Sequence, residues 1–488
     1  MNNIEKYVDK LLIYIIIFNS IYFVLSLFTG NYFDFSVFTV DIDLSRPRQL
    51  IGVILFVFSS FFFFLAKLKF NINYKILVIS SYLSLLLVAV SFESFLIHTH
   101  NNANLDLEVG RVKYLEKAAK KAKNLNIDFD ARTPYQVIMD FRKNNIEVFP
   151  SSSPGGMLHL EEPFMIDNHP AVLMSGISNK MHITINESGK YDTYISDKYG
   201  FNNLNPDYEY PIDIMLLGDS NIEGYAVAPE DNIQGSLKKL GTNTISVGKA
   251  GHGSLLLLAS LIEYAKPLKP KNLIWFYTSY DNLMNLRMEL KSPILTRYLD
   301  DENFSQKLIN KQKEIDDFVI KYTERKLSDF PKQKKKRKHN SQKFISKLKR
   351  VAMFDRIITL FSSTLRGGIY VIEDPLYESF RLILSKAHLI AKASNSNLYF
   401  VYMPLFTEIE QKKGLNKRVI SIVEELNIPM IDIYNKVFLN HHDPLSLFPL
   451  RLGHGHYTAE GSNLIARSIY EEIYQSSING IYNHTSNG

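Results

Sequence analysis

The chain has 488 residues, of which 46% are hydrophobic and 22% are charged, and its formal net charge is +6 at pH 7. This length is enough for one large domain or two ordinary ones. The net charge is modest for such a long chain, and it comes largely from one lysine-rich stretch at 332–350. The sequence has no signature of a nucleic-acid-binding fold, so we exclude a nucleic-acid-binding protein. Cysteine is absent, so no disulfide can indicate the compartment.

Three apolar runs occupy the first hundred residues, at 11–27, 50–66 and 76–97. Each is rich in Ile, Leu, Phe and Val, and each approaches the ~20 residues that a helix needs to cross a bilayer. The loop at residues 67–75 carries three lysines and no acid, so the positive-inside rule makes it cytoplasmic. We therefore expect residues 1–98 to form a membrane region with three transmembrane helices. Everything after about residue 98 would then be extracytoplasmic.

Short apolar segments alternate with helical patterns in the second half of the chain. The expected strands are 212–217, 244–247, 273–278, 398–403 and 430–433, and the expected helices are 232–240, 254–264, 407–426 and 459–474. This alternation predicts an α/β fold in which helices cover both faces of a mainly parallel sheet. Ligands in such folds bind at the carboxyl ends of the strands.

Polar residues follow three of these strands. Gly218-Asp219-Ser220 ends the first, a glycine loop at 248–253 follows the second, and Asp281-Asn282 follows the third. A serine at a strand end with a helix behind it is a candidate nucleophile, although such residues more often form a turn and a helix cap. His456 lies on the loop before the last expected helix, where it is placed to act as the base that a serine hydroxyl requires.

These four blocks, in this order, resemble the SGNH, or GDSL, hydrolase superfamily over about residues 205–475. The resemblance implies a flavodoxin-like sheet, Ser220 as nucleophile and His456 as general base. It also implies an oxyanion hole built from the backbone N–H groups of Ser220 and Gly251 and from an asparagine side chain, which we take as Asn282. No cofactor and no metal are implied.

The chain departs from the family pattern at two points. The third block reads Ser279-Tyr280-Asp281-Asn282, so Asp281 takes the place of the oxyanion-hole asparagine unless a one-residue shift lets Asn282 serve. An ionised carboxylate at that position would repel the developing negative charge. The family motif Asp-x-x-His is also missing, because Gly453 lies three residues before His456. We take Asp443 as the acid that orients His456, with Asp432, or a dyad without any acid, as the alternatives.

The remaining segments surround the hydrolase-like domain at 206–480. Residues 99–205 are expected to be a lead-in packed on that domain, in which 128–133, 186–191 and 196–203 resemble the lead-in of bacterial membrane-anchored SGNH proteins. Residues 151–156 are typical of an exposed loop. We interpret about 300–365, which contains the lysine-rich stretch, as a basic helical insertion.

We predict a membrane-anchored, extracytoplasmic serine esterase or O-acyltransferase of the bacterial inner membrane, whose partner is the lipid bilayer. Its substrate would be an acylated cell-surface glycan or lipid, attacked through an acyl-enzyme on Ser220. Acyl transfer would require a membrane partner that delivers the acyl group. The alternative is a catalytically weakened SGNH fold that serves as a glycan-binding or assembly subunit of an envelope complex.

Overall fold

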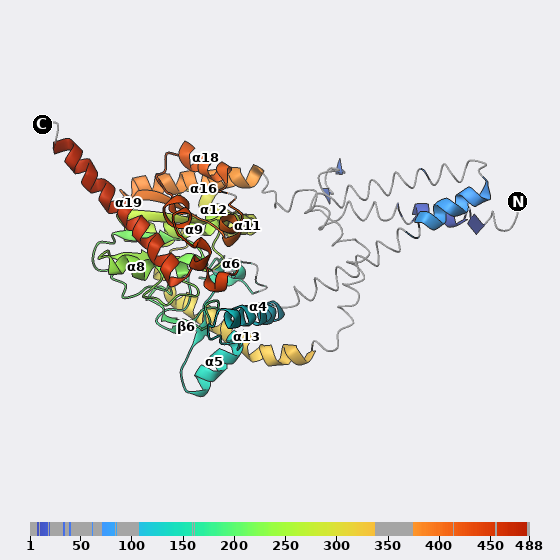
Figure 1. Cartoon of the computed structure of the whole chain (residues 1–488), viewed down its shortest axis with the longest axis horizontal. Helices are drawn as coiled ribbons and strands as arrows, with labels where there is room; N and C mark the ends of the chain where they lie inside the picture. The colour runs from blue at the N-terminus through green and yellow to red at the C-terminus, as the bar shows by residue number, and fades with distance from the viewer. Residues whose placement is uncertain are drawn as a thin grey trace. The chain divides into compact units, whose positions relative to one another are not determined.

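The computed structural model describes residues 107–336 except 159 and 161, residues 374–485 except 413, 454 and 455, and short stretches between residues 7 and 84. The chain divides into two compact units. One consists of Met1–Gly110 and Lys335–Val371, and the other consists of Arg111–Lys334 and Ile372–Gly488. The second unit contains the parallel sheet and the candidate site (Figure 1).

A five-stranded parallel sheet forms the centre of the second unit. Its strands are β8 (Ile214–Leu217), β9 (Thr244–Ser246), β10 (Asn272–Thr278), β11 (Asn397–Met403) and β12 (Met430–Ile431). They lie in the order β12-β11-β10-β8-β9, and every neighbouring pair is parallel. This is the flavodoxin-like order, with a topological switch point between β8 and β10. The predicted α/β class with a mainly parallel sheet is confirmed.

Helices cover both faces of the sheet because successive strand side chains point in opposite directions. On one face, Leu216 and Ile274 belong to an apolar cluster with α8 (Ile233–Lys239) and α19 (Ala459–Thr485). On the other, Leu217 and Trp275 cluster with side chains from the remaining covering helices, α9 (Ser254–Ser260), α11 (Ser279–Glu289), α16 (Asp374–Ala393) and α18 (Lys417–Glu425). The four strand side chains are fully buried. Figure 1 shows α16 and α18 lying side by side.

The segment before β8 forms small elements within the same unit. They are α4 (Leu107–Asn124), α5 (Pro134–Lys143), β3 (Phe149–Pro150), α6 (Pro154–Met157), β4 (Phe164–Ile166), β5 (His169–Ala171), β6 (Met181–Ile183) and β7 (Thr193–Ile195). Strands β3, β6 and β7 form a three-stranded sheet, and β4 pairs with β5. Helix α5 starts with a capping box, in which Thr133 and Gln136 each accept a hydrogen bond from the other's backbone N–H.

The other elements lie between the sheet strands or between β12 and α19. They are α7 (Ser220–Glu223), η1 (Leu261–Ala265), α10 (Lys266–Leu268), α12 (Pro293–Asp300), η2 (Leu308–Asn310), α13 (Gln312–Lys336), α17 (Phe406–Glu410), η3 (Tyr434–Leu439), η4 (Pro444–Leu447) and η5 (Pro449–Arg451). The prediction of a single helix at 407–426 is wrong. It is two helices, α17 and α18, because the chain turns between them at Gly414, whose φ is +71°. The second half of the expected insertion, from 337, lies outside the described residues.

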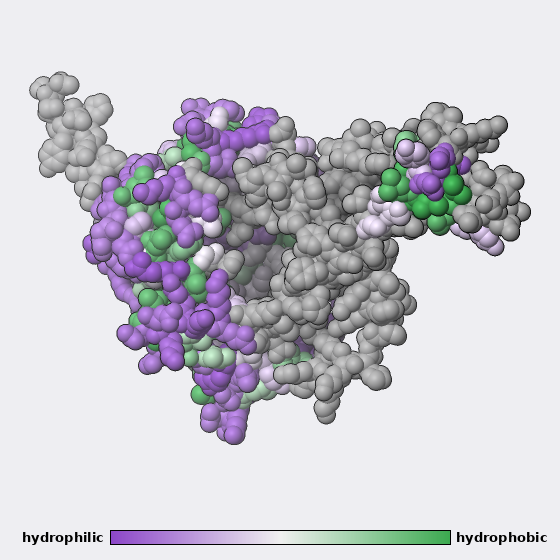
Figure 2. All heavy atoms as spheres, turned by 45° about the vertical axis from the view of Figure 1, so that its right-hand side comes forward, coloured by the Kyte–Doolittle hydropathy of each residue, from purple (hydrophilic) through white to green (hydrophobic). Residues whose placement is uncertain are grey.

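Most of residues 1–106 lie outside the described residues, and so do most of the three predicted membrane runs. In the described part of the first unit, β1 (Phe33–Asp34) pairs with β2 (Thr39–Val40), and Leu12, Ile15 and Ile79 form a small apolar cluster. Among the residues that the structure describes, we find no helix with the length and hydrophobicity of a membrane span. Figure 2 shows that the visible, described surface of the second unit is mainly hydrophilic, with hydrophobic side chains in between.

Candidate active site

Ser220 lies at the switch point of the sheet, on the one-turn helix α7 that directly follows β8. Asp219 caps this helix, because its Oδ1 accepts a hydrogen bond from the Asn221 backbone N–H at 2.9 Å. Glycine is required at 218, since a Cβ there would lie 2.2 Å from Ile222 Cγ1. The tight turn therefore brings the Ser220 hydroxyl to the sheet edge where flavodoxin-like folds bind ligands.

His456 approaches Ser220 from the loop before α19. Its Nε2 lies 2.7 Å from Ser220 Oγ, and its side chain is 14% exposed. The Tyr225 ring packs beside the imidazole with 5.2 Å between centroids. The loop is held by the Thr458 N–H, which donates to the Leu447 carbonyl at 2.9 Å. The structure thus brings the predicted nucleophile and the predicted base within the distance needed for direct proton transfer.

The acid that contacts His456 is Glu187, from the lead-in segment. Its Oε2 lies 2.9 Å from His456 Nδ1 and also accepts the His456 backbone N–H at 2.8 Å. The Glu187 carboxylate is 3% exposed, so water screens the interaction little. A local turn presents it, in which Asn186 Oδ1 accepts the Gly189 N–H at 2.8 Å. In the sequence, the stretch 186–191 indicates only a family-like lead-in and no chemical role.

The two acids considered from the sequence have other partners. Asp443, our first choice, forms an ion pair with Arg451, whose Nη1 lies 3.1 Å from Asp443 Oδ1. Asp432 accepts the backbone N–H of Asn435 at 3.0 Å and caps the turn there. The position of the orienting acid is therefore occupied by Glu187, because the lead-in folds over the His456 loop.

A buried ion pair supports the loop that carries Gly251. Glu223, the last residue of α7, pairs with Lys249, and both side chains are 0% exposed. The second carboxylate oxygen of Glu223 accepts the Ala250 N–H at 2.7 Å, and Tyr194 donates to the first at 3.0 Å. Gly251 follows with φ of +79°, a conformation that favours glycine. The helix bearing Ser220 and the predicted oxyanion loop are thus joined by charged hydrogen bonds.

Asn282, the third predicted oxyanion donor, has structural partners. It is fully buried, its Oδ1 accepts the Thr278 N–H at 2.8 Å, and its Nδ2 donates to the His252 carbonyl at 3.2 Å. These bonds tie the end of β10 to the loop after β9. The side chain of Asp281 lies outside the described residues. The donor roles of Ser220 N–H, Gly251 N–H and Asn282 stay predictions.

The segment 151–156, which we expected to be an exposed loop, packs against the loop after β9. Ser152 is 6% exposed, and Ser153 Oγ donates to the Ala250 carbonyl at 2.9 Å. A Cβ on Gly155 would lie 1.9 Å from the Gly251 carbonyl oxygen. The Ser- and Gly-rich composition therefore reflects close backbone contact between two segments. The prediction of an exposed loop is wrong for Ser152 and Pro154, which are buried, whereas Gly156 is exposed.

A pocket of about 300 Å³ adjoins Glu187. Glu187 and Ala250 line it together with three tyrosines, Tyr114 of α4, Tyr191 and Tyr225. Burial, and then the negative charge of Glu187, raise the pKa of Tyr114 above its ordinary value, so this phenol stays protonated at neutral pH. Helix α4 therefore contributes Tyr114 to the surroundings of Glu187.

The arrangement supports acyl transfer to and from a serine. A buried carboxylate holds the imidazole, and the imidazole is hydrogen-bonded to a serine hydroxyl, which is the arrangement found in serine hydrolases. Among the described residues, no group of three or more His, Asp or Glu side chains is placed to hold a metal ion. The expectation of chemistry without a cofactor stays a prediction.

Comparison with known proteins adds only a general similarity of fold. Neither a protein-family model nor a curated protein matches the sequence. A lipase/acylhydrolase from Enterococcus faecalis has 14% identity and a TM-score of 0.29, over 54% of this chain and 95% of its own. A putative acylhydrolase from Bacteroides fragilis has 12% identity and a TM-score of 0.29, over 56% and 91%. The acetyl xylan esterase AlAXEase has 10% identity and a TM-score of 0.29, over 54% and 100%. Similarities at this level carry no functional argument.

Proposed function

We propose that the chain is a serine ester hydrolase of the SGNH type. The observation that carries this proposal is the continuous hydrogen-bonded series Glu187–His456–Ser220 at the switch point of the sheet. A serine hydroxyl is a weak nucleophile until a neighbouring base removes its proton. Here the base is in contact with the hydroxyl, and a buried acid contacts the other side of the imidazole.

In the proposed reaction, Ser220 Oγ attacks the ester carbonyl carbon while His456 Nε2 takes the hydroxyl proton. The tetrahedral oxyanion is stabilised by the Ser220 and Gly251 N–H groups, and each such donor is worth roughly 3 to 4 kcal/mol. His456 then protonates the departing alkoxide, which leaves an acyl-enzyme. Water, activated by the same histidine, releases the acid and regenerates Ser220. Glu187 keeps the imidazole oriented and stabilises its positive charge.

The substrate we propose is an acylated cell-surface glycan or lipid. Transfer of the acyl group to a second hydroxyl shares the first half of the reaction, and it would need a membrane partner that delivers the acyl group. Hydrolysis needs only water, so we favour it. Product analysis separates the two: hydrolysis releases free acid, whereas transfer produces a new ester on an added acceptor.

We also propose that the chain is anchored in the bacterial inner membrane, with the second unit outside the cytoplasm. Three apolar runs of suitable length support the anchor. In the described part of these runs, Ile13 is 51% exposed and Leu77 is 61% exposed, which a lipid surface would cover. A reporter that is active only outside the cytoplasm, fused after Gly488, should be active. An inactive reporter would show that the orientation is wrong.

Labelling with a fluorophosphonate probe tests the catalytic proposal. The full chain in detergent should become covalently modified, and Ser220→Ala should abolish the modification. His456→Ala should slow it strongly, because the hydroxyl then lacks its base. Failure of the folded wild-type chain to react would refute the enzyme and favour a weakened SGNH fold that binds glycan as part of an envelope assembly. In the sequence, that alternative drew support from Asp281 and from the missing Asp-x-x-His acid. Glu187 supplies a carboxylate in contact with His456, whereas the side chain of Asp281 lies outside the described residues.

A further inference from the structure

The loop after β9 contains a β-turn at Lys249–His252, which is closed by the His252 N–H donating to the Lys249 carbonyl at 3.2 Å. Gly251 is the third residue of this turn and has φ of +79°. This value is typical of a type II turn, whose third position favours glycine. The Lys249 N–H donates to the Gly218 carbonyl at 3.2 Å, so the turn is fixed close to Ser220 at the switch point of the sheet.

The Gly251 N–H has no hydrogen-bond partner among the described residues. The N–H groups on both sides of it are bonded, since that of Ala250 donates to Glu223 at 2.7 Å and that of His252 closes the turn. Gly251 is also partly exposed, whereas Ala250 and His252 are buried. An oxyanion hole needs an accessible N–H that is held in place and not already bonded. These features agree with the predicted role of Gly251.

The direction of this N–H depends on the peptide group between Ala250 and Gly251. Type I and type II turns differ mainly by a rotation of this central peptide by roughly 180°, and a glycine at the third position allows both forms. The peptide is planar and trans, so its C=O and its N–H point in opposite directions. A hydrogen bond that holds the Ala250 carbonyl therefore also fixes the direction of the Gly251 N–H.

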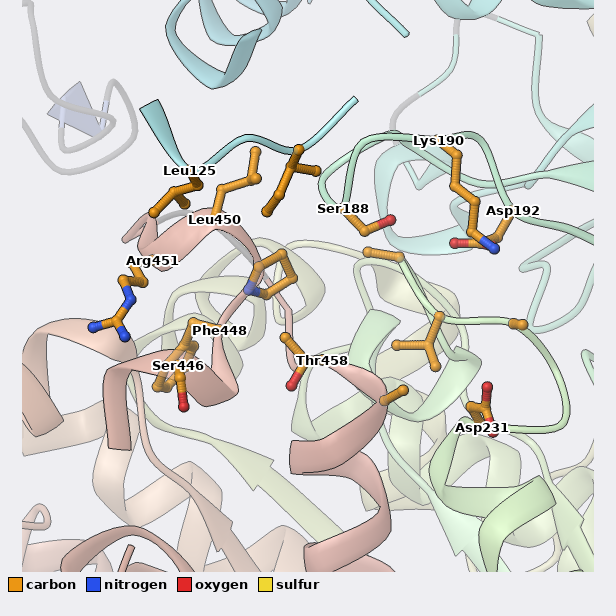
Figure 3. Close-up of a pocket in the computed structure, with 16 residues that line it drawn as sticks. Leu125, Ser188, Lys190, Asp192, Asp231, Ser446, Phe448, Leu450, Arg451 and Thr458 are labelled. Carbon is orange, nitrogen blue, oxygen red and sulfur yellow. The ribbon is translucent and has the colours of Figure 1, made fainter. Parts of the chain in front are cut away.

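Ser153 of the lead-in supplies this hydrogen bond. Its Oγ donates to the Ala250 carbonyl at 2.9 Å. Donation to the carbonyl also polarises the peptide, which strengthens its N–H as a donor. Ser153 and Ala250 both line the pocket that adjoins Glu187, and neither lines the larger pocket of about 450 Å³ around Leu450 (Figure 3). The contact therefore borders the same pocket as the triad acid.

We propose that Ser153 is a positioning residue of the oxyanion hole. It holds the central peptide of the turn in the type II orientation, so that the Gly251 N–H stays directed at the oxyanion. This rests on the proposed hydrolase function. The lead-in then has two roles in the reaction, because it supplies Glu187 to the histidine and Ser153 to the oxyanion turn.

Kinetics on the full chain in detergent test this role. Ser153→Ala should lower kcat for p-nitrophenyl acetate about tenfold to 100-fold and change KM less than about twofold, because the Gly251 N–H acts on the transition state. The sulfur of a thiono ester is a weak hydrogen-bond acceptor and gains little from this N–H. The ratio of kcat/KM for p-nitrophenyl acetate to that for p-nitrophenyl thionoacetate should therefore fall about tenfold in Ser153→Ala. A purely structural role would lower both rates equally, and an unchanged ratio would overturn the proposal.

Ser292→Ala is the matched control, since Ser153 is also the N-cap of α6. Ser153 Oγ accepts the Gly156 N–H at 3.4 Å, and Ser292 Oγ accepts the Leu295 N–H of α12 at the same distance of 3.4 Å. Both variants lose one cap and should lower the unfolding temperature to a similar extent, whereas Ser292→Ala should keep kcat within about twofold. Equal losses of kcat in the two variants would overturn the proposal.

A conservative variant and the wild-type chain complete the test. Ser153→Thr keeps a hydroxyl that can donate and cap, so its kcat should lie within about threefold of the wild-type value. A threonine variant as slow as Ser153→Ala would overturn the proposal. If the wild-type chain is active and Ser153→Ala is equally fast, this proposal fails and the hydrolase function stands. If the wild-type chain hydrolyses neither ester, the hydrolase function is refuted and this proposal fails with it.

Discussion

Replacing Glu187 by glutamine tests the acid of the triad. A single oxygen, Oε2, contacts both the His456 ring and the His456 backbone N–H, so one substitution alters both contacts. Glutamine keeps the shape of the side chain and removes its charge. If the amide NH₂ group faces Nδ1, it forces the imidazole into the tautomer that cannot accept the Ser220 proton. If the amide oxygen faces Nδ1, the developing imidazolium loses its counter-charge.

The expected loss is taken from the corresponding Asp→Asn substitution of the triad acid in serine proteases. Removing the charge of the triad acid lowers kcat about 10⁴-fold, which corresponds to about 5.5 kcal/mol of transition-state stabilisation. Because Glu187 is 3% exposed, water cannot replace its charge efficiently. We therefore expect kcat for p-nitrophenyl acetate to fall between about 10³-fold and 10⁴-fold. The rate of fluorophosphonate labelling should fall in parallel.

The matched control is Asp443→Asn, which neutralises the acid that the sequence favoured. Asp443 is paired with Arg451, and both side chains are partly exposed, so its loss should cost less than about 1 kcal/mol of stability and leave kcat within about threefold. Thermal unfolding of both variants shows whether a lost activity reflects a lost fold. Our reasoning is refuted if Glu187→Gln keeps more than about a tenth of the wild-type kcat, or if Asp443→Asn loses as much as Glu187→Gln.

Three further predictions concern the buried surroundings of the site. Glu223→Gln leaves the Lys249 charge buried without a counter-charge, and the free energy of unfolding measured with denaturant should fall by about 3–5 kcal/mol; a loss below about 1 kcal/mol would contradict the role of the pair. Burial lowers the pKa of His252 from 6.5 to about 3. Between these two pH values the unfolded state binds more protons than the folded state, so the free energy of unfolding decreases as the pH falls from 6.5 towards 3. His252→Leu should remove up to about 1.4 kcal/mol per pH unit of that slope, and an unchanged slope would contradict the assignment. Gly155→Ala places a Cβ 1.9 Å from the Gly251 carbonyl oxygen, in the predicted oxyanion loop, and should lower kcat on the order of 100-fold. Gly156→Ala, whose nearest contact is the Ser153 side-chain oxygen at 3.2 Å, should lower kcat much less. Equal kcat values for the two variants would disprove a contact that positions the loop.

The sheet was predictable because each strand is a short buried run bounded by turn residues. Those features are local, so the five strands were expected within about two residues of their observed positions. Their spatial order followed from the family resemblance. The helix at 407–426 was misjudged because its apolar periodicity continues through Gly414, and periodicity alone does not show a left-handed residue.

The acid of the site was not predictable in the same way. Glu187 and His456 are 269 residues apart, and Asn186-Glu187-Ser188-Gly189 has the composition of an ordinary turn. The only signal was the resemblance of this stretch to the lead-in of membrane-anchored relatives, and that resemblance named no chemical role. Asp443 was favoured because it is near His456 in sequence. In the fold, the nearest cation, Arg451, pairs with it.

The sequence by itself determined the α/β class, the candidate nucleophile Ser220 and the candidate base His456, because each is encoded by short-range patterns at a strand end or before a helix. Only the tertiary structure decided that Glu187 contacts His456. It also decided that Asn282 is hydrogen-bonded to the backbone of Thr278 and His252, and that the segment 151–156 is packed against the loop after β9. All three depend on contacts between segments far apart in the chain. Such contacts arise when the lead-in buries its polar groups against the sheet domain, and no local pattern specifies which groups meet.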